Sequence, residues 1–193
     1  TYSEQFEILT TRNLKIIHKR KFKTILQRES YYNIVNGYKK YFLATLNPEK
    51  YIDNVTFEQI YSLYSFDQNL RNIFMPHLLF IENNIKTLIA YHFSELYGHN
   101  HNIYLNISNF NTDTPNNMSK AASLITKINH DINDQVRMLH NAIIHYMQKY
   151  NHIPLWVLTN ILTFGRINTF YSRMKLVDQQ LVSAHFNLSA SDF

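Results

Sequence analysis

Two clusters of arginine, histidine and asparagine carry side chains that could act on a phosphodiester. The first cluster consists of Arg137, His140, Asn141 and His145. Imidazoles accept and donate protons near neutral pH, and a guanidinium stabilises negative charge that develops on a phosphate. On one continuous helix Arg137, Asn141 and His145 would occupy positions i, i+4 and i+8, with His140 one turn from Arg137. These four side chains could therefore converge on one phosphate.

The second cluster is formed by Arg71 and His77, with Asn72 directly after the arginine and five residues between the two groups. It offers the same proton transfer and charge stabilisation as the first cluster. Six positions along a helix, however, place the two side chains on different faces. A structural alternative stays open, in which Arg71 shares a polar stripe with Glu82, and Glu82 pairs with Lys86 at i and i+4.

The segment 12–40 is strongly basic and has the chemistry of a nucleic-acid-binding surface. It holds nine of the chain's 19 lysines and arginines, and its one acidic residue is Glu29. Clustered cations neutralise phosphates, and exposed aromatic faces let unpaired bases stack, which favours single-stranded or structured RNA over duplex DNA. The alternative is a solvated basic helix face above core tyrosines. The candidate RNA-binding residues are Lys15, Lys19, Arg20, Lys21, Lys23, Arg28, Tyr31, Tyr32, Tyr38, Lys39 and Lys40.

Composition limits the other chemistry that the chain could perform. Its 193 residues carry a formal charge of +5 and include no cysteine, which excludes disulfide scaffolds and cysteine nucleophiles and fits a reducing compartment such as the cytoplasm. The letters His99-Asn100-His101 lie in a polar segment, where solvated side chains are expected rather than a metal site. We therefore expect neither a metal nor another cofactor. No apolar run of about 18 residues occurs, so no membrane span is expected.

The residue pattern predicts an all-α protein. With three glycines and four prolines the chain is poor in turn residues, and no alternating pattern of useful length predicts a strand. Basic N-terminal helices are expected within 1–45, one of them over 14–28 and another over 31–43. In the helix over 14–28, the residues expected to face inward are Ile17, Phe22, Ile25 and Leu26.

A long core helix is expected over 56–98. Thr56 and Gln59 have the spacing of a capping box at its start, and Gly98 suits its C-terminal end. Pro76 lacks a backbone donor, so a kink or a break is expected there. The apolar residues that follow the helical period are Ile60, Leu63, Leu70, Phe74, Ile81, Ile85, Leu88 and Leu96.

The second half of the chain is also expected to be helical. A second core helix is predicted over 117–150, followed by C-terminal helices within 154–186. Trp156, the single tryptophan, is expected to anchor the core, and His92 is expected to be a satisfied core histidine. We expect one domain over 1–193.

Five stretches, taken in order, carry a family resemblance. They are SYYNIVNGYKKYF at 30–42, TFEQIYSLYSFDQNLRNIF at 56–74, FIENNIKTLIAYHFSELYG at 80–98, HYMQKYNHIPLWVLTNILTFGRINTFY at 145–171 and VSAHF at 182–186. Together they resemble the Abi family of abortive-infection phage-resistance proteins, of the AbiD/AbiF type. The resemblance implies a HEPN-like helical bundle with additional N- and C-terminal helices.

The resemblance also implies a function. Many HEPN proteins are metal-independent ribonucleases that dimerise with facing active sites, and their motif has four to six residues between an arginine and a histidine. The resemblance therefore implies a toxin-like endoribonuclease of anti-phage defence. Its implied partners are RNA and a second copy of the chain. Some similar proteins are held in check by a small structured RNA. Arg71 and His77 match the motif literally, whereas His140 replaces the arginine before His145, which puts catalysis there in doubt but not phosphate binding.

Two other functions stay open at this point. One is a non-catalytic, HEPN-like RNA-binding effector whose active site has become a phosphate pocket. The other is a protein-interaction module that senses a phage component, which an exposed apolar groove would favour.

Overall fold

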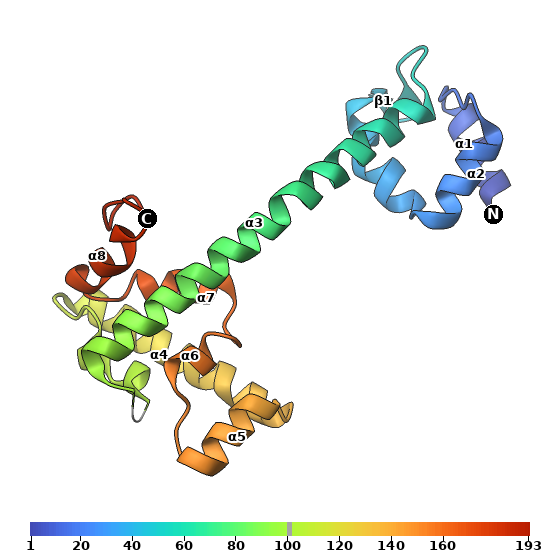
Figure 1. Cartoon of the computed structure of the whole chain (residues 1–193). Coiled ribbons are helices and arrows are strands. Elements are labelled where there is room, and N and C mark those ends of the chain that lie inside the picture. The colour runs from blue at the N-terminus through green and yellow to red at the C-terminus, as the bar shows by residue number, and fades with distance from the viewer. Residues whose placement is uncertain (100–101) are drawn as a thin grey trace. The chain divides into compact units, whose positions relative to one another are not determined.

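Helices dominate the architecture of this chain. The computed structural model describes residues 1–99 and 102–193, in two compact units, Thr1–His77 and Leu78–Phe193 (Figure 1). The prediction of an all-α protein is confirmed, since the described residues add to the helices only one small sheet and isolated bridges. The single domain expected over 1–193 stays a prediction. Among the described residues, no helix combines the length and the apolar character that crossing a membrane requires.

The first unit begins with helices α1 (Tyr2–Thr11) and α2 (Lys19–Arg28). The expected helix over 14–28 is therefore shorter at its start. Lys15 is held in extended backbone instead, because its amide donates to Val55 O over 3.0 Å and its carbonyl accepts from Phe57 N over 2.8 Å. The bridge ties the start of α2 to a segment about forty positions further on, which local propensity does not reveal.

A second departure follows α2. One helix was expected over 31–43, but a π-helix, Tyr32–Asn36, and a 3-10 helix, Lys39–Tyr41, occupy this stretch. The chain then forms an antiparallel hairpin of β1 (Leu43–Leu46) and β2 (Glu49–Tyr51), where no strand was predicted. Strands of three and four residues are too short to display an alternating pattern, so the sequence offers no periodic signal for them.

The core of the first unit gathers apolar side chains from α1, α2, the π-helix, the hairpin and the start of α3 (Phe57–Tyr97). Phe22 of α2 packs edge-on against Phe57, with ring centroids 4.7 Å apart. The inward residues predicted for α2 are correct at Phe22, Ile25 and Leu26, but Ile17 is 61% exposed. Because Ile17 precedes the first turn of α2, the helical period does not apply to it.

Helix α3 begins and ends as predicted. Gln59 N donates to Thr56 Oγ1 over 3.2 Å and Thr56 N donates to Gln59 Oε1 over 2.9 Å, which completes the capping box. Gly98, with φ of +88°, follows the last helical residue. The break considered at Pro76 does not occur, since α3 continues through it. A proline removes one backbone donor, and long segments of helix on both sides of Pro76 maintain the structure.

The middle of α3 carries an unusual surface. Its large apolar side chains are exposed, including Leu70, Phe74 and Ile81, which follow the helical period. The segment is helical, as this period predicts, but no other part of the described chain covers these side chains. We call this set the apolar segment of α3, and it comprises Phe66, Leu70, Ile73, Phe74, Met75, Leu78, Leu79, Phe80 and Ile81.

The second unit continues from α3 with two short 3-10 helices, Ile103–Leu105 and Ile107–Asn109. The single helix expected over 117–150 is wrong. Leu139 has a φ of +55°, and this left-handed residue ends the helical run. The α-helices after the 3-10 turns are α4 (Pro115–Arg137), α5 (Asn141–Tyr150), α6 (Leu155–Leu158), α7 (Phe164–Tyr171) and α8 (Leu176–Ala184).

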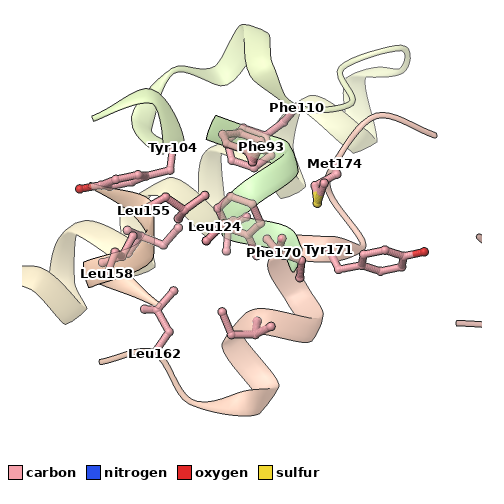
Figure 2. Packing of buried hydrophobic residues seen from close by; sticks show 14 of the residues in the cluster. Phe93, Tyr104, Phe110, Leu124, Leu155, Leu158, Leu162, Phe170, Tyr171 and Met174 are labelled. Carbon is pink, nitrogen blue, oxygen red and sulfur yellow. The ribbon is translucent and has the colours of Figure 1, made fainter. Parts of the chain in front are cut away.

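Aromatic rings form the centre of the core of this unit (Figure 2). Phe93 of α3 lies with its ring centroid 5.0 Å from Phe170 of α7 and 5.5 Å from Phe110. The edge-to-face arrangement of Phe93 and Phe170 is a favourable geometry for aromatic pairs. Tyr104 is buried as well, and its hydroxyl donates to Ile153 O over 2.9 Å, so its polar atom is satisfied.

Candidate nucleic-acid interface and histidine clusters

The polar face of α2 presents a row of cations to water. The opposite face of the helix is buried through Phe22, Ile25 and Leu26, so the lysines and arginines between these positions must point outward. No carboxylate of the described residues pairs with them. The ammonium of Lys19 lies over the ring of Phe6, 4.3 Å from its centroid, and the other ammonium and guanidinium groups are available to phosphates. The exposed cations of this face are Lys19, Arg20, Lys21, Lys23 and Arg28.

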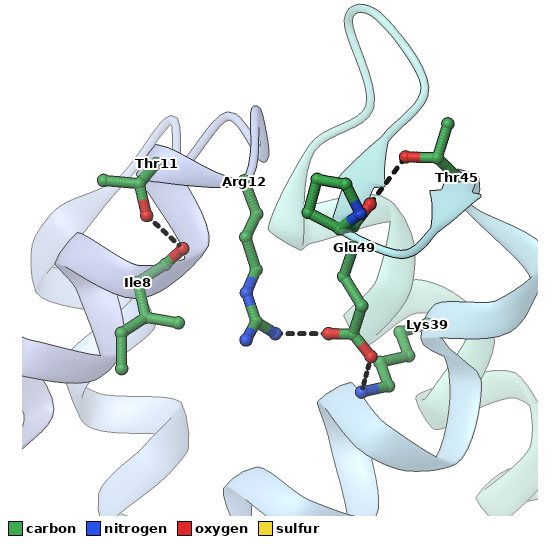
Figure 3. A network of polar contacts seen from close by, with 7 residues as sticks. Ile8, Thr11, Arg12, Lys39, Thr45 and Glu49 are labelled. Carbon is green, nitrogen blue, oxygen red and sulfur yellow. Dashed lines mark hydrogen bonds and ion pairs between the residues drawn. The ribbon is translucent and has the colours of Figure 1, made fainter.

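Part of the basic segment is neutralised within the protein. Glu49 of β2 accepts from Lys39 through one carboxylate oxygen and from Arg12 through the other (Figure 3). The hydrogen bond from Lys39, together with the charges of both cations, lowers the pKa of Glu49 from its ordinary value of 4.5. Lys39 therefore has a structural partner, and its contribution to an RNA surface is weaker than that of the cations on α2.

Lys15 and Lys40 lie outside the helical row. The Lys15 ammonium donates to Asn54 Oδ1 over 2.7 Å, which leaves two of its three donors free. Lys40 is exposed and lies over the ring of Tyr41, 5.0 Å from its centroid. Both ammonium groups therefore remain at the surface, where a phosphate could reach them.

The three predicted tyrosines are in different environments. Tyr32 is 70% exposed and can offer its ring to a base. Tyr31 is half-buried against the core of the first unit, and this burial raises its pKa. Tyr38 uses its hydroxyl to donate to Asp67, and this hydrogen bond raises its pKa. Tyr32 is therefore the stacking candidate among the three.

Arg71 lines a cavity of about 380 Å³ in the first unit. Its guanidinium pairs with Asp67, four positions earlier on α3, and donates to the Tyr38 hydroxyl over 3.2 Å. The expected pair of Glu82 and Lys86 is present at 2.8 Å, but the carboxylate partner of Arg71 is Asp67. The cavity walls are formed by Tyr32, Asn33, Gly37, Tyr38, Tyr64, Asp67, Gln68 and Arg71.

This cavity has the groups of a phosphate or nucleotide subsite. An arginine is held in place by a carboxylate and a phenol, and an exposed tyrosine ring lies in the same wall. His77 is exposed and is not part of the cavity. Six residues of helix turn its side chain about 120° away from that of Arg71, so a single copy of the chain does not bring this arginine and this histidine together.

The break between α4 and α5 divides the predicted cluster of Arg137, His140, Asn141 and His145. Arg137 ends α4 and pairs with Asp134 at 3.6 Å, whereas Asn141 begins α5. The stripe expected for Arg137, Asn141 and His145 is therefore wrong, because it requires one continuous helix. His145 is exposed on α5. His140 lies in the break, and its Nδ1 is buried without a hydrogen-bond partner among the described residues.

The structure brings together two histidines that sequence reasoning did not pair. His92 of α3 is buried, as predicted, and its Nε2 lies 3.0 Å from Nε2 of His185, just after α8, but its Nδ1 has no hydrogen-bond partner among the described residues, so the imidazole is satisfied only in part. A hydrogen bond between these nitrogens requires one imidazole to donate and the other to accept. Glu95 Oε2 lies 3.5 Å from Nδ1 of His92. The signal available in the sequence was that both histidines lie in family-like stretches, 80–98 and 182–186.

Trp156 corrects another expectation. It was predicted to anchor the core, but 45% of it is exposed, and it lines a cavity of about 840 Å³ in the second unit. Its neighbours Leu155 and Val157 are buried, so the tryptophan is the residue of α6 that turns outward. His99 lies near it, with ring centroids 6.5 Å apart. Asn100 and His101, the rest of that polar tripeptide, lie outside the described residues.

The comparisons with known proteins give a family. A family model described as Abi-like protein matches residues 24–193. The match includes the second half of α2, the Arg71 cavity and every histidine discussed above, whereas Lys19, Arg20, Lys21 and Lys23 precede it. Searches of curated proteins and of solved structures found no match to this chain.

Proposed function

Since the chain belongs to the Abi-like protein family, we propose that it is an RNA-binding protein of bacterial phage defence, acting as a toxin-like, metal-independent endoribonuclease in the cytoplasm. The observation that carries the proposal is the exposed cationic face of α2, whose side chains have no carboxylate partner among the described residues. Uncompensated cations in a row are what binding to a phosphate backbone requires.

RNA would bind to the first unit in two ways. The cations of α2 contact phosphates, and Tyr32 stacks on an unpaired base. Arg71 receives a further phosphate in the cavity it lines, where Tyr38 and Asp67 already fix the orientation of its guanidinium. A phosphate there would compete with Asp67 for the guanidinium donors and gain the bidentate geometry that arginine offers.

Cleavage without a metal needs a base, an acid and a cation at the phosphate. Within one copy, Arg71 and His77 face different directions, and the break after α4 separates Arg137 from His145. The catalytic arrangement we propose is therefore composite. Two copies of the chain each supply part of it, with His145 as the proton-transfer group and Arg71 or Arg137 as the cation; His140 and Asn141 would assist at the same phosphate.

The apolar segment of α3 supports a homodimer. A helix that is apolar around much of its circumference is normally covered by protein or lipid. Phe66, Ile73 and Phe80 are each more than 60% exposed and form one stripe, and Met75 and Leu79, each about half exposed, lie on the other side of the helix, so exposure here is not limited to that stripe. A second copy would remove this surface from water and bring two sets of RNA-binding groups together.

One experiment tests the function as a whole. The purified full chain is incubated with total cellular RNA in EDTA, and the products are sequenced. We expect discrete 5′ ends after cleavage and a small RNA that copurifies with the protein and inhibits it. Binding without any cleavage, in EDTA or with added Mg²⁺, would exclude the nuclease and leave RNA binding.

A non-catalytic RNA-binding effector is the second candidate, and one observation favours it. Arg71 is engaged by Asp67, and its literal motif partner, His77, faces away from it. A site of this kind binds a phosphate without supplying an acid or a base. The third candidate, a protein-interaction module that senses phage, draws its support from the apolar segment of α3.

A further inference from the structure

The cavity beside Trp156 is lined by two helices of the second unit. Residues of α3 recur along one wall at helical spacing, at positions 83, 86, 87, 90, 91, 94 and 95, and α6 supplies the facing wall together with the turn after it. At about 840 Å³ the cavity has the size of a small-molecule site. No part of the RNA surface proposed for the first unit contributes to it.

Aromatic rings are exposed on both walls. Trp156 is 45% exposed on α6 and Tyr91 is 60% exposed on α3. Trp156 has no alternative position in the core, because Leu155, Val157 and Leu158 already fill the buried face of α6. A large indole that lies open to water in a ligand-sized cavity provides a stacking surface for a flat ring.

Polar groups complete the walls. Lys86 pairs with Glu82 at 2.8 Å, and an ammonium has three donors, so two are left for a ligand. Asn160 uses one amide N–H to donate to Trp156 O over 3.1 Å, which leaves its second N–H and its carbonyl oxygen. Asn83 adds a second amide on the opposite wall, with no side-chain hydrogen bond to another described residue.

We propose that this cavity binds one unpaired nucleotide. The base stacks on Trp156, the amides of Asn83 and Asn160 hydrogen-bond to its edge, and Lys86 contacts the phosphate. Asparagine amides supply both a donor and an acceptor, as base edges require. The nucleotide could be free or part of single-stranded RNA. Only the second source rests on the proposed function, because a free nucleotide needs no RNA-binding surface elsewhere.

Trp156 makes the test specific, since it is the chain's single tryptophan and therefore its one indole emitter. The full chain is titrated with AMP, GMP, CMP and UMP while indole emission is followed. We expect saturable quenching by nucleotides and none by ribose 5-phosphate, which lacks the base. Unchanged emission with all four nucleotides, together with no heat of binding in calorimetry, would overturn the inference.

Variants locate the binding. Trp156→Ala should weaken binding by roughly 10- to 100-fold in calorimetry, because the base no longer has an indole to stack on. Asn160→Ala should weaken it by about 2- to 10-fold, whereas the matched control Asn168→Ala, an exposed asparagine of α7, should leave it unchanged. Circular dichroism melting identifies a variant that fails to fold. If folded Trp156→Ala and Asn160→Ala both bind as the parent does, the nucleotide lies elsewhere and the inference is wrong.

Two further ligands decide whether the bound nucleotide is free or is part of single-stranded RNA. If a single-stranded tetranucleotide quenches the indole emission as mononucleotides do, and a duplex of equal length does not, the cavity binds unpaired RNA. Quenching by mononucleotides alone assigns it to a free nucleotide. If substituting the α2 cations abolishes RNA binding but mononucleotides still quench, the cavity binds nucleotides independently of the RNA surface. If the parent binds no RNA yet mononucleotides quench, the proposed function fails and the nucleotide site stands.

Discussion

Arg71 donates a hydrogen bond to the hydroxyl of Tyr38 over 3.2 Å, although the two residues are 33 positions apart in the chain. The contact joins the family-like stretches 30–42 and 56–74 at one cavity. Because its orientation is already fixed, Arg71 could receive a phosphate by exchanging Asp67 for it, and such preorganisation favours charge stabilisation.

Replacing the proposed proton-transfer histidine tests the enzyme directly. His145→Ala should abolish RNA cleavage and cellular toxicity, with a rate loss of about 10²–10⁴-fold, because a positioned acid or base is worth that much. Folding and RNA binding should persist, since His145 is exposed. Cleavage of a labelled RNA in EDTA is the measurement. The control is His130→Ala, an exposed histidine of α4 that pairs with Asp134 and should cleave normally.

Arg71→Ala and His77→Ala examine the literal motif in the same assay. Arg71→Ala should weaken both RNA binding and cleavage, since Arg71 is proposed to hold a phosphate. His77→Ala should have little effect. An inactive His77 variant beside an active His145 variant would place the catalytic histidine on α3. Full toxicity of every variant would contradict the nuclease and favour the binding effector.

RNA binding should weaken steeply with salt. Neutralised phosphates release counterions, with a slope of log K against log salt of roughly −0.7 per contacted phosphate of a single strand. Replacing Lys19, Arg20, Lys21 and Lys23 by glutamine should weaken binding and flatten this slope by about 0.7 for each phosphate that is no longer neutralised. Filter binding over a series of salt concentrations measures it. The matched change of Lys120 and Lys127, exposed lysines of α4, should leave the slope unaltered.

The chain should be a dimer held by the apolar segment of α3. Light scattering at micromolar concentration should give twice the chain mass of 23.1 kDa. Phe74→Glu should convert the dimer to monomer, because a carboxylate cannot be buried in an apolar contact without a partner. Leu46→Glu, at an exposed leucine of the hairpin, is the control and should stay dimeric. A parent protein that is monomeric with and without RNA would remove the composite catalytic site.

The Glu49 network predicts how the stability of the first unit depends on pH. The pKa of Glu49 is lowered from 4.5 by Lys39 and Arg12, so its contribution is present above about pH 4.5 and is lost as pH falls through the lower folded value. Glu49→Gln should destabilise the chain by about 1 kcal/mol at pH 7, a modest effect because the pair is partly solvated. The difference from the parent should vanish at strongly acidic pH in urea unfolding. Glu7→Gln, at an exposed acid of α1, should change stability little at any pH.

The features that the sequence predicted correctly are those set by residues close together in the chain. The capping box of Thr56 and Gln59 and the terminal Gly98 depend on neighbours within one turn, and both are present. The burial of Phe22 and Ile25 follows from helical period alone. Family-like stretches also anticipated the Abi-like family that the chain matches.

What the sequence did not predict depends on distant partners or on residues that give no local signal. The break at Leu139 lies in a Met-Leu-His stretch that has good helix formers and neither glycine nor proline. Trp156 is exposed because its neighbours fill the core, and the sequence of α6 alone does not show which of its apolar residues faces outward. The pair of His92 and His185 spans 93 positions, beyond any periodic pattern.

Four asparagines in the described part of this chain occupy positions where the backbone has a positive φ. Among the described residues, the non-glycine positions with positive φ are Asn13, Asn54, Leu139, Asn151 and Asn187. Asparagine tolerates the left-handed region better than other side chains, so it takes the place of glycine in a sequence that has three glycines. Exchange of Asn151 or Asn187 for glycine should therefore be close to neutral for folding, whereas exchange of Asn13 or Asn54 also removes side-chain hydrogen bonds. Three of these four asparagines, Asn13, Asn151 and Asn187, follow the ends of helices, and Leu139 occupies the corresponding place after α4.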